Sequence, residues 1–193
     1  MVRLRVFRDR RSAVAAGLTF GLLSAMELSD NARPGAASDS VQDQGTIQEF
    51  GAAMRVAVSV SVITLRRGRP IPRRPRRWWA GLGLIWSGAI VNRAAKRKLG
   101  KNYRSMLTVV DAHDVTTEGP YKVVRHPMYA GASLICVGAG LAIDSLPSFA
   151  AWTLPIAALV RRIRVEEAML RDALGDRYDD YARDRARLVP LLW

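Results

Sequence analysis

The residues best suited to chemistry lie in one short stretch of the chain, at positions 113–131. This stretch reads HDVTTEGPYKVVRHPMYAG and holds both histidines of the sequence, His113 and His126. Its Gly-Pro pair marks a tight turn, and Pro127 suits the first turn of a following helix. Arg125 and His126 are then expected just before a helix N-terminus, where backbone N–H groups and the helix dipole favour an anion. A basic anchor at a membrane surface is the alternative interpretation.

A glycine follows on the same predicted helix. Gly131 lies four residues after Pro127, so the two share a helix face. Because glycine has no side chain, a bulky group could approach the backbone closely at this point. The whole stretch therefore predicts a place for an anionic ligand with a large planar part.

A second group of polar residues follows the last apolar run of the chain. In the segment RRIRVEE at positions 161–167, Arg162 and Glu166 are four residues apart and share a helix face. An ordinary solvated ion pair explains this spacing, but charges at a membrane border are costly unless they are paired. Further on, Tyr178 and Tyr181 are three residues apart, a spacing that packing alone explains.

Five apolar runs must position these residues. Each run has 14 to 16 residues, and they occupy positions 12–26, 50–65, 78–91, 128–143 and 146–160. A perpendicular membrane span needs roughly 20 residues, but flanking arginines can snorkel and a bilayer can thin around short helices. The runs predict an all-α, polytopic integral membrane protein with about five short membrane helices.

The charge distribution supports a membrane protein over a nucleic-acid-binding one. The 193-residue chain has a formal net charge of +13 although 49% of its residues are hydrophobic. Its basic residues fall in blocks that adjoin the apolar runs, which is typical of membrane flanks. The lone Cys136 lies inside an apolar run without zinc-type neighbours, so we expect neither a disulfide nor a metal site.

The positive-inside rule does not give one topology. It places the basic segments 3–11, 66–77 and 93–104 all on the cytoplasmic side. That is possible if the run 78–91 dips into the membrane and returns, or if one earlier run does not span. For the chain as a whole, we expect N-terminal membrane helices with a basic connector at positions 1–77 and a functional core at 78–193.

Asp144 separates the fourth and fifth apolar runs and predicts a helical hairpin. With Ser145 to Pro147 it makes a short polar break between the two runs. The two helices would then run antiparallel, and their outer ends would return to one membrane face. This brings the Arg125–His126 pair and the Arg162–Glu166 pair into one candidate site.

The two motifs together resemble a known family. The pattern G-P-Y-x-x-x-R-H-P-x-Y-x-G ends at Gly131, and E-E-x-x-L-x-x-x-x-G-x-x-Y-x-x-Y begins at Glu166. These patterns are similar to those of the isoprenylcysteine carboxyl methyltransferases and the related phospholipid methyltransferases. The resemblance covers roughly positions 78–193 and leaves the N-terminal third without specific features.

The resemblance implies a cytosolic pocket for S-adenosylmethionine. Arg162 and Glu166 match the family's catalytic pair beside the transferred methyl group. The cofactor-binding residues that the resemblance implies are His113, Val115, Gly119, Tyr121, His126, Tyr129 and Gly131. We add Arg125 to this set because it lies at the expected anion-binding position.

The resemblance also implies a lipophilic acceptor that enters between the helices. The expected reaction is carboxyl O-methylation of an isoprenylcysteine-like or other small lipid, and the partners are membrane lipids and a lipidated substrate, without nucleic acid. The short, Arg- and Ala-rich chain suggests a prokaryotic inner or plasma membrane, with the active site facing the cytoplasm. The alternatives are a membrane NADPH-dependent reductase of the sterol type and a non-catalytic, lipid-binding membrane protein.

Overall fold

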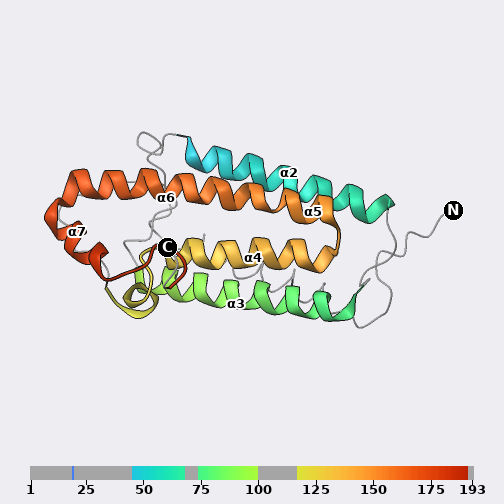
Figure 1. Ribbon diagram of the computed structural model, residues 1–193, viewed down its shortest axis with the longest axis horizontal. Coiled ribbons are helices and arrows are strands. Elements are labelled where there is room, and N and C mark those ends of the chain that lie inside the picture. The colour runs from blue at the N-terminus through green and yellow to red at the C-terminus, as the bar shows by residue number, and fades with distance from the viewer. Residues whose placement is uncertain (1–18, 20–44, 68–73, 100–116, 191–193) are drawn as a thin grey trace.

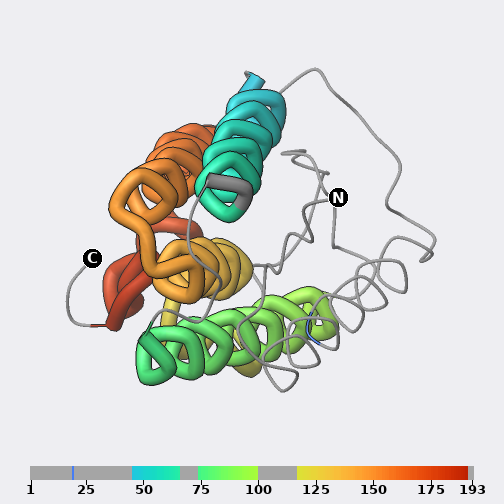
Figure 2. Tube along the Cα trace, turned by 90° about the vertical axis from the view of Figure 1, so that its right-hand side faces the viewer, coloured from blue at the N-terminus to red at the C-terminus, as the bar shows by residue number. Residues whose placement is uncertain are grey.

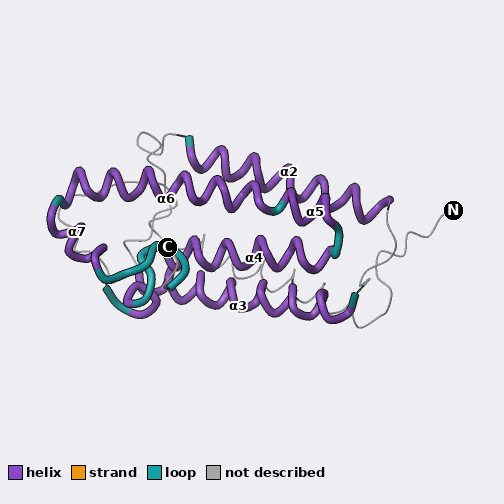
Figure 3. The backbone as a smooth tube through the Cα atoms, in the orientation of Figure 1, coloured by secondary structure: helices purple, strands orange, loops and turns teal. Residues whose placement is uncertain are grey.

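The computed structural model describes Thr19 and residues 45–67, 74–99 and 117–190. These segments are helical and contain no strand, as Figure 3 shows, so the predicted all-α class is confirmed. The first apolar run, 12–26, lies outside the described residues except for Thr19. The elements are α2 (Thr46–Arg67), α3 (Pro75–Leu99), the 3-10 helix η2 (Gly119–Lys122), α4 (Pro127–Ile143), α5 (Leu146–Ala151), α6 (Thr153–Leu174) and α7 (Asp176–Arg183).

The long helices form a bundle with roughly parallel axes (Figure 1). Seen end-on in Figure 2, α4 lies between α3 on one side and the α2–α6 pair on the other. The helix α3 packs mainly on α4, whereas α2 packs on α5 and α6. The apolar runs at 50–65, 78–91, 128–143 and 146–160 thus lie side by side within one bundle.

The α3–α4 contact depends on glycines at matching positions. Gly81 and Gly88 of α3 face Gly138 and Gly131 of α4, and each pair brings two helix backbones together. A Cβ atom added to Gly138 would lie 2.6 Å from the carbonyl oxygen of Gly81. Small residues permit such close approach between helices in a membrane, where packing replaces the hydrophobic effect as the driving force.

The hairpin predicted at Asp144 is present. Asp144 ends α4 in the left-handed conformation, with φ at 50°, and α5 begins two residues later. Its carboxylate accepts a hydrogen bond of 2.9 Å from Arg77 Nη1 at the start of α3, and Arg74 lies 3.8 Å away. The turn therefore also ties the hairpin to α3.

A small polar cluster attaches α2 to α5 and its C-terminal neighbour. Ser61 Oγ donates to the carbonyl of Ala57 at 2.7 Å, so its lone pairs accept from Ser148 Oγ at 2.8 Å and from Trp152 Nε1 at 3.0 Å. All three of these side chains are buried. Because each polar atom has a partner, the cluster holds α2 at one register along α5.

The continuity of α3 excludes one of the two topologies that the sequence left open. Its 25 residues form one uninterrupted helix, about 37 Å long at 1.5 Å per residue. The interpretation in which the run 78–91 dips into the membrane and returns is therefore wrong. Among the described helices, the segment Thr46–Leu65 of α2 is long and apolar enough to cross a membrane, and 17% of its most apolar window is buried.

The glycine contacts predict that an alanine substitution lowers stability at Gly138 but not at Gly83. Gly138→Ala should destabilise the protein by about 1–3 kcal/mol because the new methyl group forces the two backbones apart. Gly83→Ala is the matched control, since nothing lies within 4 Å of its Cβ position. We expect this control to keep or slightly raise stability, because alanine is the better helix former. Thermal unfolding in detergent measures both, and equal midpoints would contradict the packing argument.

Candidate active site

The segment with Arg125 and His126 is held from its backbone by the C-terminal part of the chain. The amide of Arg125 donates to the carbonyl of Ala186 at 2.8 Å, and the amide of His126 donates to that of Arg187 at 3.0 Å. A parallel bridge between Val124 and Ala186 continues this pairing. His126 is the N-cap residue of α4, and its side chain is buried. The backbone pairing thus gives Arg125 and His126 a defined position at the end of the bundle.

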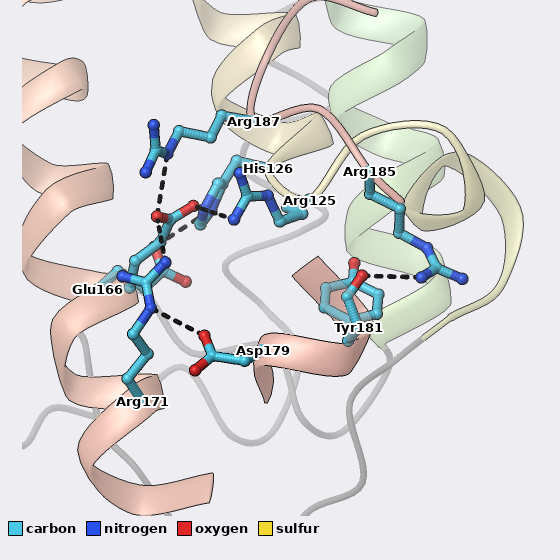
Figure 4. A network of polar contacts seen from close by, with 9 residues as sticks. Arg125, His126, Glu166, Arg171, Asp179, Tyr181, Arg185 and Arg187 are labelled. Carbon is cyan, nitrogen blue, oxygen red and sulfur yellow. Dashed lines mark hydrogen bonds and ion pairs between the residues drawn. The ribbon is translucent and has the colours of Figure 1, made fainter. Parts of the chain in front are cut away.

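Several charged side chains of this region contact the carboxylate of Glu167, and Figure 4 shows part of this network. Its side chain is only 2% exposed. One carboxylate oxygen contacts Arg125 Nη1 at 3.0 Å and His126 Nε2 at 3.3 Å. The other accepts from Arg187 Nε at 3.0 Å and Arg171 Nη2 at 3.4 Å. Four side chains from three parts of the chain therefore meet on one carboxylate.

These partners keep Glu167 ionised. Burial alone would raise the pKa of Glu167, because it penalises the charged form. Hydrogen bonds from His126 and Arg187, with the charge of Arg125, outweigh that effect and lower the pKa to about 2. A buried carboxylate is tolerated when it is paired in this way.

Glu167 is a site residue that the sequence did not reveal. In the segment RRIRVEE, the spacing pairs Arg162 with Glu166 on one helix face, and the motif that begins at Glu166 includes Glu167 without giving it a role. The spacing of Glu167 and Arg171, also four residues, was an available signal. The convergence of Arg125 and Arg187 on the same carboxylate depends on the tertiary structure alone.

Arg162 is buried between three helices. Its Nε donates to the hydroxyl of Tyr129 in α4 at 3.0 Å, and its Nη1 donates to Oγ1 of Thr46 at the start of α2 at 2.9 Å. The guanidinium also lies over the Tyr129 ring, 6.0 Å from the centroid. Tyr129 also stacks with His126, with 5.7 Å between the ring centroids. Arg162 and His126 are thus linked through one aromatic ring.

Glu166 completes the group. Its Oε2 atom lies 3.8 Å from Nδ1 of His126, and its side chain is 27% exposed. The hairpin therefore does bring the two sequence motifs together, as predicted from Asp144. The catalytic roles of Arg162 and Glu166 and the binding roles of Arg125 and His126 stay predictions.

The other predicted cofactor residues differ in what the structure says of them. Tyr121 is buried in η2, and its carbonyl accepts from the hydroxyl of Tyr181 at 3.4 Å. Gly119 begins η2 with φ at +58°, which favours glycine. Gly131 faces the α3 backbone, so helix packing is sufficient reason for a glycine there and its cofactor role stays a prediction. The predicted His113 and Val115 lie outside the described residues.

Two buried polar atoms close to this group, Arg125 Nε and Glu166 Oε2, make no hydrogen bond to described residues. The Tyr178 phenol is their neighbour, since Arg125 acts on it through a side-chain hydrogen bond and Glu166 acts on it through its charge. One cationic donor and one ionic acceptor are therefore available to a ligand that carries both an anionic and a cationic group.

Comparison with known proteins identifies the family. The model for the phospholipid methyltransferase family matches residues 76–177, which is more than half of the chain. The chain belongs to this family. The match covers nearly all of α3 to the first residues of α7, so it contains the whole first motif and the second motif as far as Arg177.

Several curated relatives of this chain are isoprenylcysteine methyltransferases, as the motifs predicted. Protein-S-isoprenylcysteine O-methyltransferase A of Arabidopsis thaliana is 28% identical over 127 residues, 63% of this chain and 64% of the plant protein. A probable protein-S-isoprenylcysteine O-methyltransferase of Oryza sativa subsp. indica is 29% identical over 54% of this chain and 56% of its own. The chain thus spans less than two thirds of these relatives' length.

A solved structure shows the same fold. The eukaryotic intramembrane Ras methyltransferase ICMT superposes with a TM-score of 0.54 and 20% sequence identity. The superposition covers 93% of this chain and 76% of the other. This chain therefore shares its fold with that solved protein.

The low pKa of Glu167 predicts a pH-dependent stability for this methyltransferase-family protein. Its folded pKa of about 2 lies below the ordinary value of 4.5, so its contribution is complete above pH 4.5 and is lost as pH falls towards 2. Glu167→Gln should lower the unfolding midpoint at pH 7, and the gap to the wild type should narrow between pH 4.5 and 2.

Asp179→Asn is the matched control, because Asp179 contacts the same Arg171 at 3.1 Å but its side chain is 57% exposed. An exposed pair contributes about 1 kcal/mol or less, so this variant should unfold close to the wild type at every pH. A gap for Glu167→Gln that does not change with pH would show that its charge is not responsible.

Proposed function

We propose that this protein is an integral membrane methyltransferase that uses S-adenosylmethionine to methylate the carboxylate of an isoprenylcysteine-like lipid. The observation that carries the proposal is the buried guanidinium of Arg162, held by Tyr129 beside His126 and Glu166. The names of the curated relatives support both the reaction and the acceptor class. The family membership supports methyl transfer over the NADPH-dependent and non-catalytic alternatives.

The residues present fit this cofactor. S-adenosylmethionine carries a carboxylate, an ammonium and a sulfonium on a nucleoside. Arg125 Nε is a donor suited to the carboxylate, and Glu166 Oε2 is an acceptor suited to a cationic group. Arg125 and His126 precede α4, where the helix dipole also favours an anion.

The chain's own residues supply alignment. When bound, S-adenosylmethionine offers a methyl group on a good leaving group, so the reaction needs geometry more than acid–base help. Arg162 would hold the acceptor carboxylate by charge-assisted hydrogen bonds and keep its charge at every physiological pH. Tyr129 fixes that guanidinium by its hydrogen bond to Nε. Glu166, one helix turn after Arg162, would orient the reacting groups.

Exposed apolar side chains support a membrane location. Val56, Val58, Val62 and Ile63 of α2 are each at least 40% exposed, and Leu146 at the hairpin is 81% exposed. Such a surface is suited to lipid contact, and it adjoins the helices that would admit a lipid acceptor. Basic residues at the end of α3, Lys96, Arg97 and Lys98, lie at the same end of the bundle as the site. Because Arg76 and Arg77 lie at the other end of α3, the positive-inside rule does not orient the bundle, and the cytoplasmic side of a prokaryotic plasma membrane stays the expectation for the site.

Ligand binding tests the cofactor. Isothermal titration calorimetry on the full chain in detergent should show heat with S-adenosylmethionine and none with NADPH, because Glu166 offers an acceptor to a cationic ligand. A radiolabelled methyl donor should then label S-farnesylcysteine with a free carboxylate but not the corresponding amide. A clear NADPH signal without one from S-adenosylmethionine would contradict the proposal and favour the reductase.

Two variants separate binding from turnover. His126→Ala should raise the donor Kd roughly tenfold, because it removes a ring that stacks on Tyr129 and contacts Glu167. Glu166→Gln should lower kcat by roughly a hundredfold and weaken donor binding less than His126→Ala does, because the amide oxygen still accepts a hydrogen bond whereas the charge at the reacting groups is lost. Calorimetry and initial rates give both quantities. An equal loss of donor binding in the two variants would show that their roles are misassigned.

A further inference from the structure

One residue of the site comes from outside the matched family region. Thr46, the first residue of α2, is fully buried. Its hydroxyl accepts from Arg162 Nη1 at 2.9 Å, across 116 positions of sequence. The family model begins only at residue 76, so neither motif nor family match points to this threonine.

We propose that Thr46 is a positioning residue for the acceptor carboxylate, acting through Arg162; this inference rests on the proposed function. The guanidinium is a planar fork, and a hydrogen bond at one nitrogen leaves it free to turn about that contact. Here Tyr129 holds Nε from α4 and Thr46 holds Nη1 from α2. Two contacts from two helices fix both the place and the plane of the cation.

The start of α2 also forms an ion pair with α6 at the protein surface. One turn after Thr46, Glu49 Oε2 accepts from Arg161 Nη1 at 2.7 Å. Further along, the Ser61 cluster sets the register of α2 on α5. Gly45, with φ at +75°, turns the chain into the helix so that Thr46 points into the bundle. The hydroxyl is therefore rigid enough to orient another side chain.

Orientation matters at this position because methyl transfer depends on alignment. A displacement of about 1 Å at a reacting group can cost roughly a hundredfold in rate. A guanidinium that has lost its Nη1 contact would still bind a carboxylate, but in several orientations, of which few are productive. The loss should therefore fall on the acceptor and on turnover, and leave the methyl donor unaffected.

The test compares Thr46→Val with Thr46→Ser in the full chain in detergent. Valine has the shape of threonine without the hydroxyl, whereas serine keeps the hydroxyl. The measurements are kcat and KM for S-farnesylcysteine with a free carboxylate, and the Kd for S-adenosylmethionine. We expect Thr46→Val to lose roughly 10- to 100-fold in kcat/KM for the acceptor. Thr46→Ser should stay within about threefold of the wild type, and both variants should keep the wild-type donor Kd.

Each outcome decides the inference. If Thr46→Val matches the wild type, or if Thr46→Ser loses as much as Thr46→Val, the hydroxyl does not position Arg162. If donor affinity falls together with kcat/KM, or the valine variant does not fold, Thr46 has a structural role and the inference is overturned. In an Arg162→Lys background, Thr46→Val should cause no further loss, because the two act as a unit. A wild type that does not methylate the probe would instead contradict the proposed function.

Discussion

The organisation of the site depends on one buried carboxylate. Glu167 is ionised and nearly inaccessible to solvent, which is costly unless its oxygens are paired. Its partners come from the segment before α4, from the next turn of α6 and from the C-terminal segment that contains Arg187. The paired carboxylate therefore holds three separate parts of the chain together. It also fixes the positions of Arg125 and His126 at the N-terminus of α4.

Helix packing brings the remaining residues into range. The glycines of α3 and α4 let their backbones meet, and the left-handed Asp144 turns α5 and α6 back along α4. Arg162 thereby reaches Tyr129 on the neighbouring helix. The helix α2, which lies outside the family match, packs on the other side and presents Thr46 to the same guanidinium. The site is consequently built from both the family core and a helix outside the family match.

Some of this was predictable because it depends on short-range patterns. Apolar runs separated by polar breaks indicate helices, and a two-residue break at Asp144 indicates an antiparallel hairpin. The hairpin was enough to predict that the Arg125–His126 and Arg162–Glu166 motifs meet. The interpretation in which the run 78–91 dips into the membrane and returns was wrong, since α3 is one continuous helix and its Gly81 and Gly88 serve contact with α4 rather than a bend. Local sequence cannot distinguish these two uses of glycine.

By itself, the sequence determined the helical class, the hairpin and the family, because each is carried by periodicity or by residues at close spacing. Only the tertiary structure decided which side chains share a partner. Glu167 collects Arg125 and Arg187, and Thr46 meets Arg162, across separations at which no periodicity operates. Such contacts follow from how whole helices pack, and a buried charge or hydroxyl then takes the partner that the packing places within hydrogen-bonding distance.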